Sequence, residues 1–282
     1  IIMKYKLLGK SGLRVSEIAL GTMTFGTEWG WGTDESTSRA IFDSYAQAGG
    51  NFIDTANRYT EGTSERYVGD FIRSDRDHFV LATKYSLQDR LNDPNFSGNH
   101  RKNMMRSVRE SLKRLNTEYI DLLWLHAWDF MTPVEEVLRG LDDLVRAGTV
   151  HYIGISDAPA WVVARANTMA ELKGWTSFIG LQVEYSLLQR TPERDLIPMA
   201  VEMGLGLTAW APLAGGALSG KYLVGETGRV AAASTRRNEK NSVIATKVVE
   251  IAEKLGVSPA QVALRWVMQQ KFTSIPLVGA KS

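Results

Sequence analysis

The sequence predicts a (β/α)8 TIM barrel preceded by a β-hairpin. Eight apolar runs of strand length alternate with helix-length segments, which is typical of a parallel sheet covered by helices. The length of 282 residues suits one barrel of roughly 250 residues. No Gly-x-Gly-x-x-Gly motif opens the first βα unit, which disfavours an open dinucleotide-binding sheet. Because no linker or low-complexity stretch divides the chain, we expect a single domain over residues 1–282.

The strands are predicted from the apolar runs themselves. Met3–Leu7 and Leu13–Ile18 flank a glycine-containing turn and are expected to form the hairpin. The barrel strands are expected at Ile18–Gly21, Asn51–Asp54, Phe79–Thr83, Ile120–His126, Val150–Ser156, Phe178–Val183, Gly206–Trp210 and Thr273–Val278.

The segments between these runs have apolar residues spaced by three and four, as in Val137, Leu138, Leu141 and Leu144, which predicts helices. Hydroxyl side chains are expected to cap helix starts at Ser64, Thr132, Thr191 and Ser258, the last three being followed by proline. Helix ends are expected at Gly49, Gly148 and Gly256. The polar stretch Gly225–Asn241 is predicted to be a loop long enough to act as a flap.

Composition excludes several classes of protein. The net charge of +2 and the lack of a Lys/Arg run disfavour a nucleic-acid partner. The chain has no cysteine, so disulfides and thiol catalysis are excluded, and its four histidines lack metal-ligand spacing. No apolar run approaches ~18 residues and no signal-peptide pattern is present, so we expect a cytoplasmic protein with no membrane partner.

Four titratable residues are expected at one rim of the barrel. Asp54 and Tyr59 follow the second predicted barrel strand, Lys84 follows the third, and His126 ends the fourth. In TIM barrels the chemistry sits at the carboxyl ends of the strands. Each residue alone has a structural interpretation, because a strand-end Asp often caps a helix, a Lys is usually solvated, and a His can be hydrogen-bonded in the core.

Together the four residues suit the delivery of a proton to a carbonyl oxygen. A tyrosine has an ordinary pKa of about 10, and a neighbouring ammonium lowers that pKa. Lys84 would act on Tyr59 in this way, Asp54 would keep Lys84 charged, and His126 would donate a hydrogen bond to the substrate oxygen. None of the four can donate a hydride, so a redox cofactor is implied.

These residues lie in motifs that resemble the aldo-keto reductase family. The motifs are Asn51-Phe-Ile-Asp54-Thr-Ala-x-x-Tyr59, Ser64-Glu65, Gly69, Ala82-Thr-Lys84, Ser111-Leu-Lys-Arg-Leu115, Asp121-Leu-Leu, Thr132-Pro-x-Glu-Glu136 and Gly148–Ser156. The resemblance covers Lys4 to Ala280. It implies that Tyr59 is the general acid, that Lys84 and Asp54 tune it, and that His126 orients the carbonyl of a small-molecule substrate. It also implies NADP(H) bound across the barrel mouth.

The resemblance further implies a set of cofactor contacts. Ser156, Asp157 and Gln182 correspond to the carboxamide site, Trp210 to the aromatic residue that stacks on nicotinamide, and Gly21 and Thr22 to the ribose side. The segment Ala211–Lys221 resembles the loop around the pyrophosphate, with Arg236 as a strap. The cofactor-binding positions carried over from this loop and from the residues after the last predicted strand are Ala211, Pro212, Leu213, Gly215, Gly216, Lys221, Gly279 and Lys281.

The chain departs from the family pattern at two places. Asp157 stands where Asn is usual, and a carboxylate cannot donate to a carboxamide oxygen. Family members commonly continue past the last strand with an Arg and a closing helix, whereas this chain has Lys281 and then Ser282, so we expect a C-terminal segment to be absent. Lys281 would meet a 2′-phosphate with less geometric definition than Arg, which leaves NAD(H) as an alternative cofactor.

Further interpretations concern four aromatic residues, a glycine-containing loop and two alternative functions. Trp29, Trp31, Trp128 and Phe130 lie on loops after the first and fourth barrel strands and are either packing residues or an aromatic substrate pocket. Gly215-x-x-x-x-Gly220-Lys221 is rejected as an ATP-binding loop, because Tyr222 replaces the Mg²⁺-binding hydroxyl. Two alternatives with the same fold remain: an NAD-dependent dehydrogenase of polyols or sugars, and a non-catalytic cofactor-sensing subunit that resembles the potassium-channel β-subunits. His126 disfavours the second, because those subunits carry Asn there.

Overall fold

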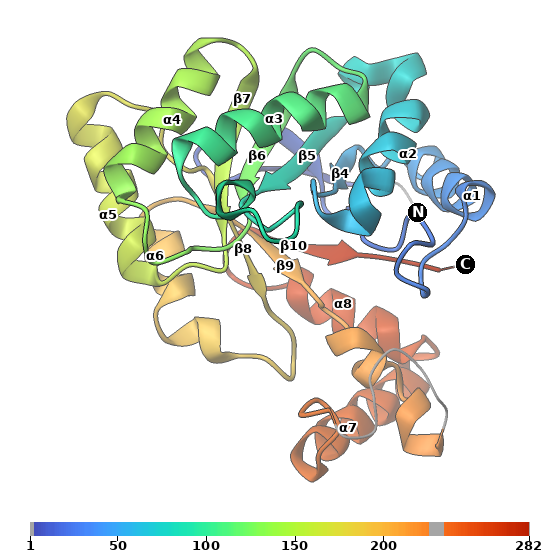
Figure 1. Ribbon diagram of the computed structural model, residues 1–282. Helices are drawn as coiled ribbons and strands as arrows, with labels where there is room; N and C mark the ends of the chain where they lie inside the picture. The colour runs from blue at the N-terminus through green and yellow to red at the C-terminus, as the bar shows by residue number, and fades with distance from the viewer. Residues whose placement is uncertain (1–2, 226–233, 282) are drawn as a thin grey trace.

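The computed structural model describes residues 3–225 and 234–281. Within them, eight parallel strands form a closed barrel surrounded by helices (Figure 1), which confirms the predicted fold class. The barrel order is β10-β3-β4-β5-β6-β7-β8-β9. The strands are β3 (Ala19–Gly21), β4 (Phe52–Asp54), β5 (Val80–Tyr85), β6 (Ile120–Leu125), β7 (Val150–Ser156), β8 (Gly180–Glu184), β9 (Gly206–Trp210) and β10 (Ser274–Val278). Every predicted barrel strand is present, with ends displaced by at most two residues.

The predicted hairpin is also present, as β1 (Tyr5–Leu7) paired antiparallel with β2 (Arg14–Ser16). Its turn closes the amino-terminal end of the barrel. Leu8 is fully buried and packs so closely on β9 that a Cβ added at Gly206 would lie 2.7 Å from its Cδ1. The backbone N–H of Lys10 donates a 2.7 Å hydrogen bond to the carbonyl of Gly204. The amino-terminal end of the barrel is therefore closed, which leaves the carboxyl-terminal end open for a binding site.

The largest side chain of the cluster inside the barrel, Trp124, is set against glycines. Trp124 on β6 is fully buried and is paired in register with Gly154 on β7, which pairs in turn with Gly180 on β8. A Cβ added at Gly154 would lie 2.3 Å from the indole of Trp124, and one at Gly180 would lie 2.8 Å from it. The absence of a side chain at Gly154 and at Gly180 thus makes room for the indole in a close-packed interior.

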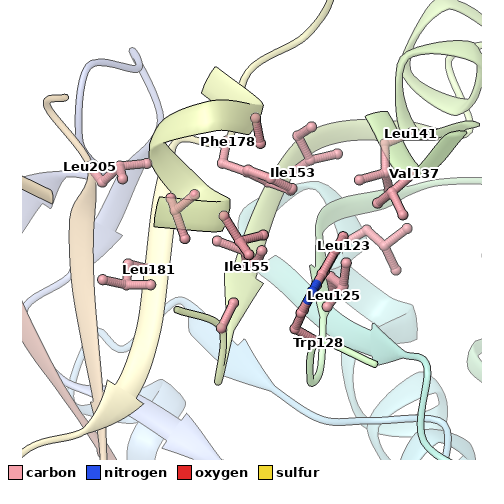
Figure 2. Close-up of a cluster of buried hydrophobic side chains, with 14 of the residues drawn as sticks. Leu123, Leu125, Trp128, Val137, Leu141, Ile153, Ile155, Phe178, Leu181 and Leu205 are labelled. Atoms are coloured by element: carbon pink, nitrogen blue, oxygen red, sulfur yellow. The ribbon is translucent and has the colours of Figure 1, made fainter. Parts of the chain in front are cut away.

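The helices cover the outside of the barrel. They are α1 (Glu35–Gln47), α2 (Thr63–Ile72), α3 (Arg101–Leu115), α4 (Val134–Arg146), α5 (Ala160–Lys173), α6 (Leu196–Glu202), α7 (Glu239–Leu255) and α8 (Pro259–Met268). Short 3-10 helices lie at Tyr59–Gly62, Arg73–His78, Pro94–Phe96, Thr191–Arg194, Ala214–Ser219 and Lys221–Val224. Figure 2 shows the largest cluster of the core, in which Leu123 and Leu125 of β6 face Val137 and Leu141 of α4. The predicted three-and-four spacing therefore marks the buried face of α4.

The predicted helix ends are only partly right. Ser258 caps α8 with a capping box, and Gly256 ends α7 in the left-handed conformation with φ 63°. Ser64 is not a cap, because it lies inside α2 and its hydroxyl donates to the carbonyl of Thr22 at 2.8 Å. The Thr132 hydroxyl donates to Asp129 instead of capping α4, and Thr191 is the first residue of a 3-10 helix.

Residues 226–233, eight of the 17 residues of the predicted flap, lie outside the described residues. The described part shows that the loop is shorter than expected, because α7 begins at Glu239 with Asn238 as its N-cap. In the described ranges, no helix combines the length and apolar character needed to cross a membrane.

Candidate active site

A cavity of about 620 Å³ opens at the carboxyl ends of the barrel strands. Residues in, or directly after, seven of the eight strands line its wall. These residues are Gly21 (β3), Asp54 (β4), His126 (after β6), Ser156 (β7), Gln182 (β8), Trp210 (β9) and Val278 (β10). The remaining strand, β5, carries Lys84 behind this wall.

Tyr59 lies in this cavity with Lys84 and His126 on two sides of its ring. The Lys84 Nζ is 4.9 Å from the centre of the ring, and the imidazole of His126 lies edge-to-face with it at a centroid distance of 5.9 Å. Tyr59 begins the 3-10 turn that follows β4, so the turn brings the phenol back over the strand ends. The structure thus brings together the residues that the sequence analysis grouped.

Lys84 and Asp54 form a buried ion pair beneath Tyr59. Both side chains are fully excluded from solvent, and the Lys84 Nζ donates to Asp54 Oδ1 and, at 2.8 Å, to the carbonyl of Thr55. Burial lowers the pKa of Lys84, but the attraction of Asp54 and Tyr59 outweighs this effect, so the pKa is raised overall. Lys84 is therefore a fixed positive charge next to the phenol.

Two opposing effects act on the pKa of Tyr59. Burial raises the pKa of Tyr59, and although the charge of Lys84 lowers it, burial is the larger effect, reinforced by the negative charge of Asp54. Lys84 therefore lowers the pKa of Tyr59 as expected, but burial raises it overall. A raised pKa favours the protonated phenol, which is the form that can give up a proton.

His126 is neutral for a related reason. Burial and the nearby charge of Lys84 both hold the pKa of its imidazole well below the usual range. Its Nδ1 is buried and has no hydrogen-bond partner among the described residues. A neutral imidazole carries a single N–H, so His126 has one hydrogen bond to donate. His126 can then donate a hydrogen bond, but it is not a protonated acid.

Most of the residues expected to contact a cofactor line the same cavity, but Thr22 and Lys221 do not. Thr22 is buried, and its hydroxyl bonds to Ser64 at 2.8 Å and to the Asp54 carbonyl at 3.1 Å. Lys221 lies behind the wall, with its Nζ 3.2 Å from where a Gly216 Cβ would be. The expected cofactor-binding residues that line the cavity are Gly21, Asp54, Ser156, Asp157, Gln182, Trp210, Ala211, Pro212, Leu213, Gly215, Gly216, Arg236, Gly279 and Lys281.

Asp157 makes a contact that the sequence did not suggest. Its Oδ1 accepts a 3.2 Å hydrogen bond from the indole N–H of Trp210, which fixes the ring expected to stack on a nicotinamide. Asp157 has φ 42°, a left-handed conformation in which Asp and Asn are favoured among non-glycine residues. Partial desolvation at the cavity wall raises the pKa of its carboxyl group above the ordinary value, although the hydrogen bond from Trp210 opposes this effect.

Two cations lie on the side of the cavity where an anionic cofactor is expected. Arg236 is ion-paired with Glu184 at the end of β8. Lys281 has its Nζ 5.5 Å from the centre of the Trp31 ring. Lys281, and Lys221 close behind Gly216, therefore add positive charge to this side of the cavity, whereas Glu184 balances the charge of Arg236.

The four aromatic residues proposed for a substrate pocket have different locations. Trp29 lines the cavity, edge-to-face with Tyr59 at 6.4 Å. Trp31 packs against Trp29 at 5.6 Å but is not part of the cavity wall. Trp128 does not fit the pocket interpretation, because it lies in the hydrophobic core with 9% of its surface exposed. Phe130 is 70% exposed and outside the cavity.

The cavity also has wall residues that the sequence analysis did not include. Leu277 and Val278 could have been expected, because they end the last strand. Arg58 could be suspected only from its place beside Tyr59. Met23, Thr24 and Leu87 carry no signal that separates them from ordinary loop residues.

A closed parallel barrel with a buried Lys–Asp pair beneath a tyrosine defines an enzyme-like site. Comparison with known proteins agrees, because the Aldo/keto reductase family model matches residues 17–282. The chain therefore belongs to the aldo/keto reductase family, whose members are oxidoreductases that act on small carbonyl substrates and generally use nicotinamide cofactors.

Individual relatives are similar over most of this chain. A norsolorinic acid reductase of Emericella nidulans is 40% identical over 284 residues, covering 96% of this chain and 72% of its own. An aryl-alcohol dehydrogenase [NADP(+)] of Phanerodontia chrysosporium is 38% identical over 293 residues, covering 96% of this chain and 76% of its own. An uncharacterized oxidoreductase of Bacillus subtilis is 36% identical, covering 99% and 88%.

Proposed function

We propose that the protein is an NADP(H)-dependent oxidoreductase that reduces aldehydes or ketones to alcohols, reversibly. The observation that carries the proposal is the buried Lys84–Asp54 pair set beneath Tyr59 at the floor of the cavity. Burying two charges is costly, so such a pair is maintained where a fixed charge next to another group is useful. The aryl-alcohol dehydrogenase relative supports both NADP and an aromatic substrate.

The residues present fit a dinucleotide. Gly215 and Gly216 have φ of 68° and 97°, and the lack of side chains there leaves loop backbone exposed to the cavity for a pyrophosphate. Gln182 uses its Nε2 on Asp54, so its Oε1 would accept from the amino group of the carboxamide, as would the second oxygen of Asp157. Trp210 would support the nicotinamide ring, and Lys281 would face a 2′-phosphate. When bound, this cofactor supplies the hydride.

The chain's own residues would handle the proton and the carbonyl. The Tyr59 hydroxyl gives its proton to the carbonyl oxygen as negative charge develops there. His126 donates a hydrogen bond to the same oxygen and so orients the carbonyl. Lys84, held charged by Asp54, stabilises the tyrosinate until water returns the proton. In the reverse direction Tyr59 accepts the proton of the alcohol.

Cofactor binding tests the proposal without any knowledge of the natural substrate. We expect NADPH to raise the melting temperature, because a ligand that binds only the native state stabilises it, by about 2.7 kcal/mol at a hundredfold excess over Kd. NADH should raise it less. The substitution Lys281→Met should narrow the difference between the two cofactors. Equal shifts with NADH and NADPH would contradict the NADP preference and favour an NAD-dependent enzyme.

Turnover tests the reaction itself. With NADPH and an aldehyde such as benzaldehyde, we expect oxidation of the cofactor that depends on the protein. A protein that binds NADPH but oxidises it with no aldehyde or ketone of a broad panel would instead indicate a cofactor-binding regulatory role.

A further inference from the structure

Trp29 and Arg58, two residues of the cavity wall near Tyr59, form a group of three side chains with Glu61. The indole N–H of Trp29 donates a 3.1 Å hydrogen bond to Glu61 Oε1, and Glu61 Oε2 is ion-paired with Arg58. The guanidinium of Arg58 lies 5.9 Å from the centre of the Trp29 ring. Each member of the group contacts the other two, so the indole has a defined orientation.

The chain brings Glu61 to this position through an unusual turn. Thr60 and Glu61 follow Tyr59 with φ of 46° and 53°, two successive left-handed residues of which neither is glycine. Such a conformation is costly, above all for a β-branched residue, and persists only where the surroundings hold it. The Thr60 hydroxyl donates a 2.6 Å hydrogen bond to the carbonyl of Phe25 and accepts one from the Ser64 N–H at 3.1 Å.

The turn also requires room on the opposite loop. Gly26 follows Phe25, and a Cβ there would lie 2.7 Å from the Thr60 hydroxyl oxygen. The loop after β3 and the loop after β4 therefore pack closely against each other. The Thr60 hydroxyl bonds to the backbone of the loop after β3, and the Glu61 carboxylate bonds to the side chain of Trp29 in that loop. The result is a fixed geometry between Trp29 and Tyr59, edge-to-face at 6.4 Å.

Glu61 acts from behind this wall. Trp29, Arg58 and Tyr59 line the active-site cavity, whereas Glu61 does not. Glu61 lines a neighbouring cavity of about 490 Å³, which shares Arg58 with the first. A ligand in the active-site cavity therefore meets Trp29 and Arg58, and Glu61 can influence it only by holding them.

We propose that Glu61 is a positioning residue that holds Trp29 against the Tyr59 site and thereby favours carbonyl substrates that carry an aromatic ring. An indole held in one orientation stacks on a planar ring without losing side-chain freedom on binding, whereas a small aliphatic group gains little from it. This inference rests on the proposed function and adds the substrate class that the wall would select.

The test compares benzaldehyde with propanal in four variants. Glu61→Ala should lower the ratio of their kcat/KM values about fivefold, mainly through the KM of benzaldehyde, as expected for one lost hydrogen bond. Glu61→Gln keeps an acceptor for the indole N–H and should stay within about twofold of the wild type. Trp29→Phe removes the donor, so adding Glu61→Ala to it should change the ratio no further. The proposal would be overturned if the effects of Glu61→Ala and Trp29→Phe on the ratio of kcat/KM values were additive in the double variant. An unchanged ratio in Glu61→Ala would also overturn it.

Glu250→Ala is the matched control, because Glu250 is also about half exposed and also pairs with a cation three residues away, Lys247 at 2.7 Å. It should leave the ratio unchanged.

A measurement without turnover separates this inference from the proposed function. The indole N–H resonance of Trp29 is identified in a ¹H–¹⁵N spectrum by its absence from Trp29→Phe. It should shift and broaden in Glu61→Ala and stay near its position in Glu61→Gln. An unmoved resonance in Glu61→Ala overturns the positioning role even if no aldehyde is reduced, whereas a shifted resonance without turnover counts against the proposed reaction alone.

Discussion

Gln182 on β8 donates a 2.9 Å hydrogen bond to Asp54 Oδ2 on β4, the strand directly opposite in the barrel. The other oxygen of Asp54 accepts from Lys84. Both oxygens of this buried carboxylate are therefore engaged by fixed donors, and Asp54 in turn fixes Lys84. The bond closes the floor of the cavity and links two strands that are 128 residues apart in the chain.

Replacing Gln182 should destabilise the fold. Gln182→Met keeps the shape but removes the donor, so one oxygen of a buried carboxylate loses its partner. We expect the free energy of unfolding to fall by about 1–3 kcal/mol, measured by urea denaturation followed by circular dichroism. In the control Gln88→Met, the lost contact is an exposed 3.2 Å bond to the Arg90 carbonyl, and the change should stay within about 0.5 kcal/mol. Equal losses in the two variants would contradict the role assigned to Gln182.

The glycine opposite Trp124 should be required for its small size. In Gly154→Ala the new methyl group would lie 2.3 Å from the indole, so either the indole or the β7 backbone must move. We expect a loss of about 1–3 kcal/mol in the free energy of unfolding. Gly12→Ala is the control, because nothing lies within 4 Å of a Cβ there and its φ is not left-handed. Adding Trp124→Phe to Gly154→Ala should recover part of the lost stability. If Gly154→Ala alone were as stable as the wild type, the prediction would be wrong and the interior would be loosely packed.

Asp157 should make stability depend on pH. The pKa of this carboxyl group is raised in the folded state, so the native protein holds the proton more tightly than the unfolded chain does. Its favourable contribution is complete below the ordinary pKa of 3.8 and is lost as pH rises through the folded-state value. Asp157→Asn keeps the left-handed conformation and an acceptor for Trp210 but cannot titrate. The stability of Asp157→Asn relative to wild type should therefore increase between pH 4 and pH 8, measured by denaturation at each pH. A difference that does not vary with pH would contradict the assigned shift.

The sequence was sufficient for the barrel and for the grouping of the proposed catalytic residues, because both follow from local rules. Each strand appears as an apolar run, and parallel strands in a barrel present their carboxyl ends at one face. Asp54, Lys84 and His126 could thus be grouped from their positions alone. Tyr59 needed the further observation that it follows the strand by five residues, within reach of the same rim.

Other features depend on geometry that residue order does not encode. Trp29 and Trp128 both follow barrel strands, yet one lines the cavity and the other enters the core. The Trp29–Glu61 bond needs two left-handed residues where Thr and Glu give no turn signal. The net rise in the pKa of Tyr59 depends on how deeply the phenol is buried, whereas the sequence indicated only which charges lie near it.

The proton donor is the central claim, and Tyr59→Phe tests it most directly. The measurement is kcat for benzaldehyde with saturating NADPH, in wild type, Tyr59→Phe and the control Tyr67→Phe on α2. Loss of a general acid should lower kcat by about 10²–10⁴-fold in Tyr59→Phe. The melting temperature shift with NADPH should be unchanged, because the ring remains. Undiminished turnover in Tyr59→Phe would contradict the assignment and require another source for the proton.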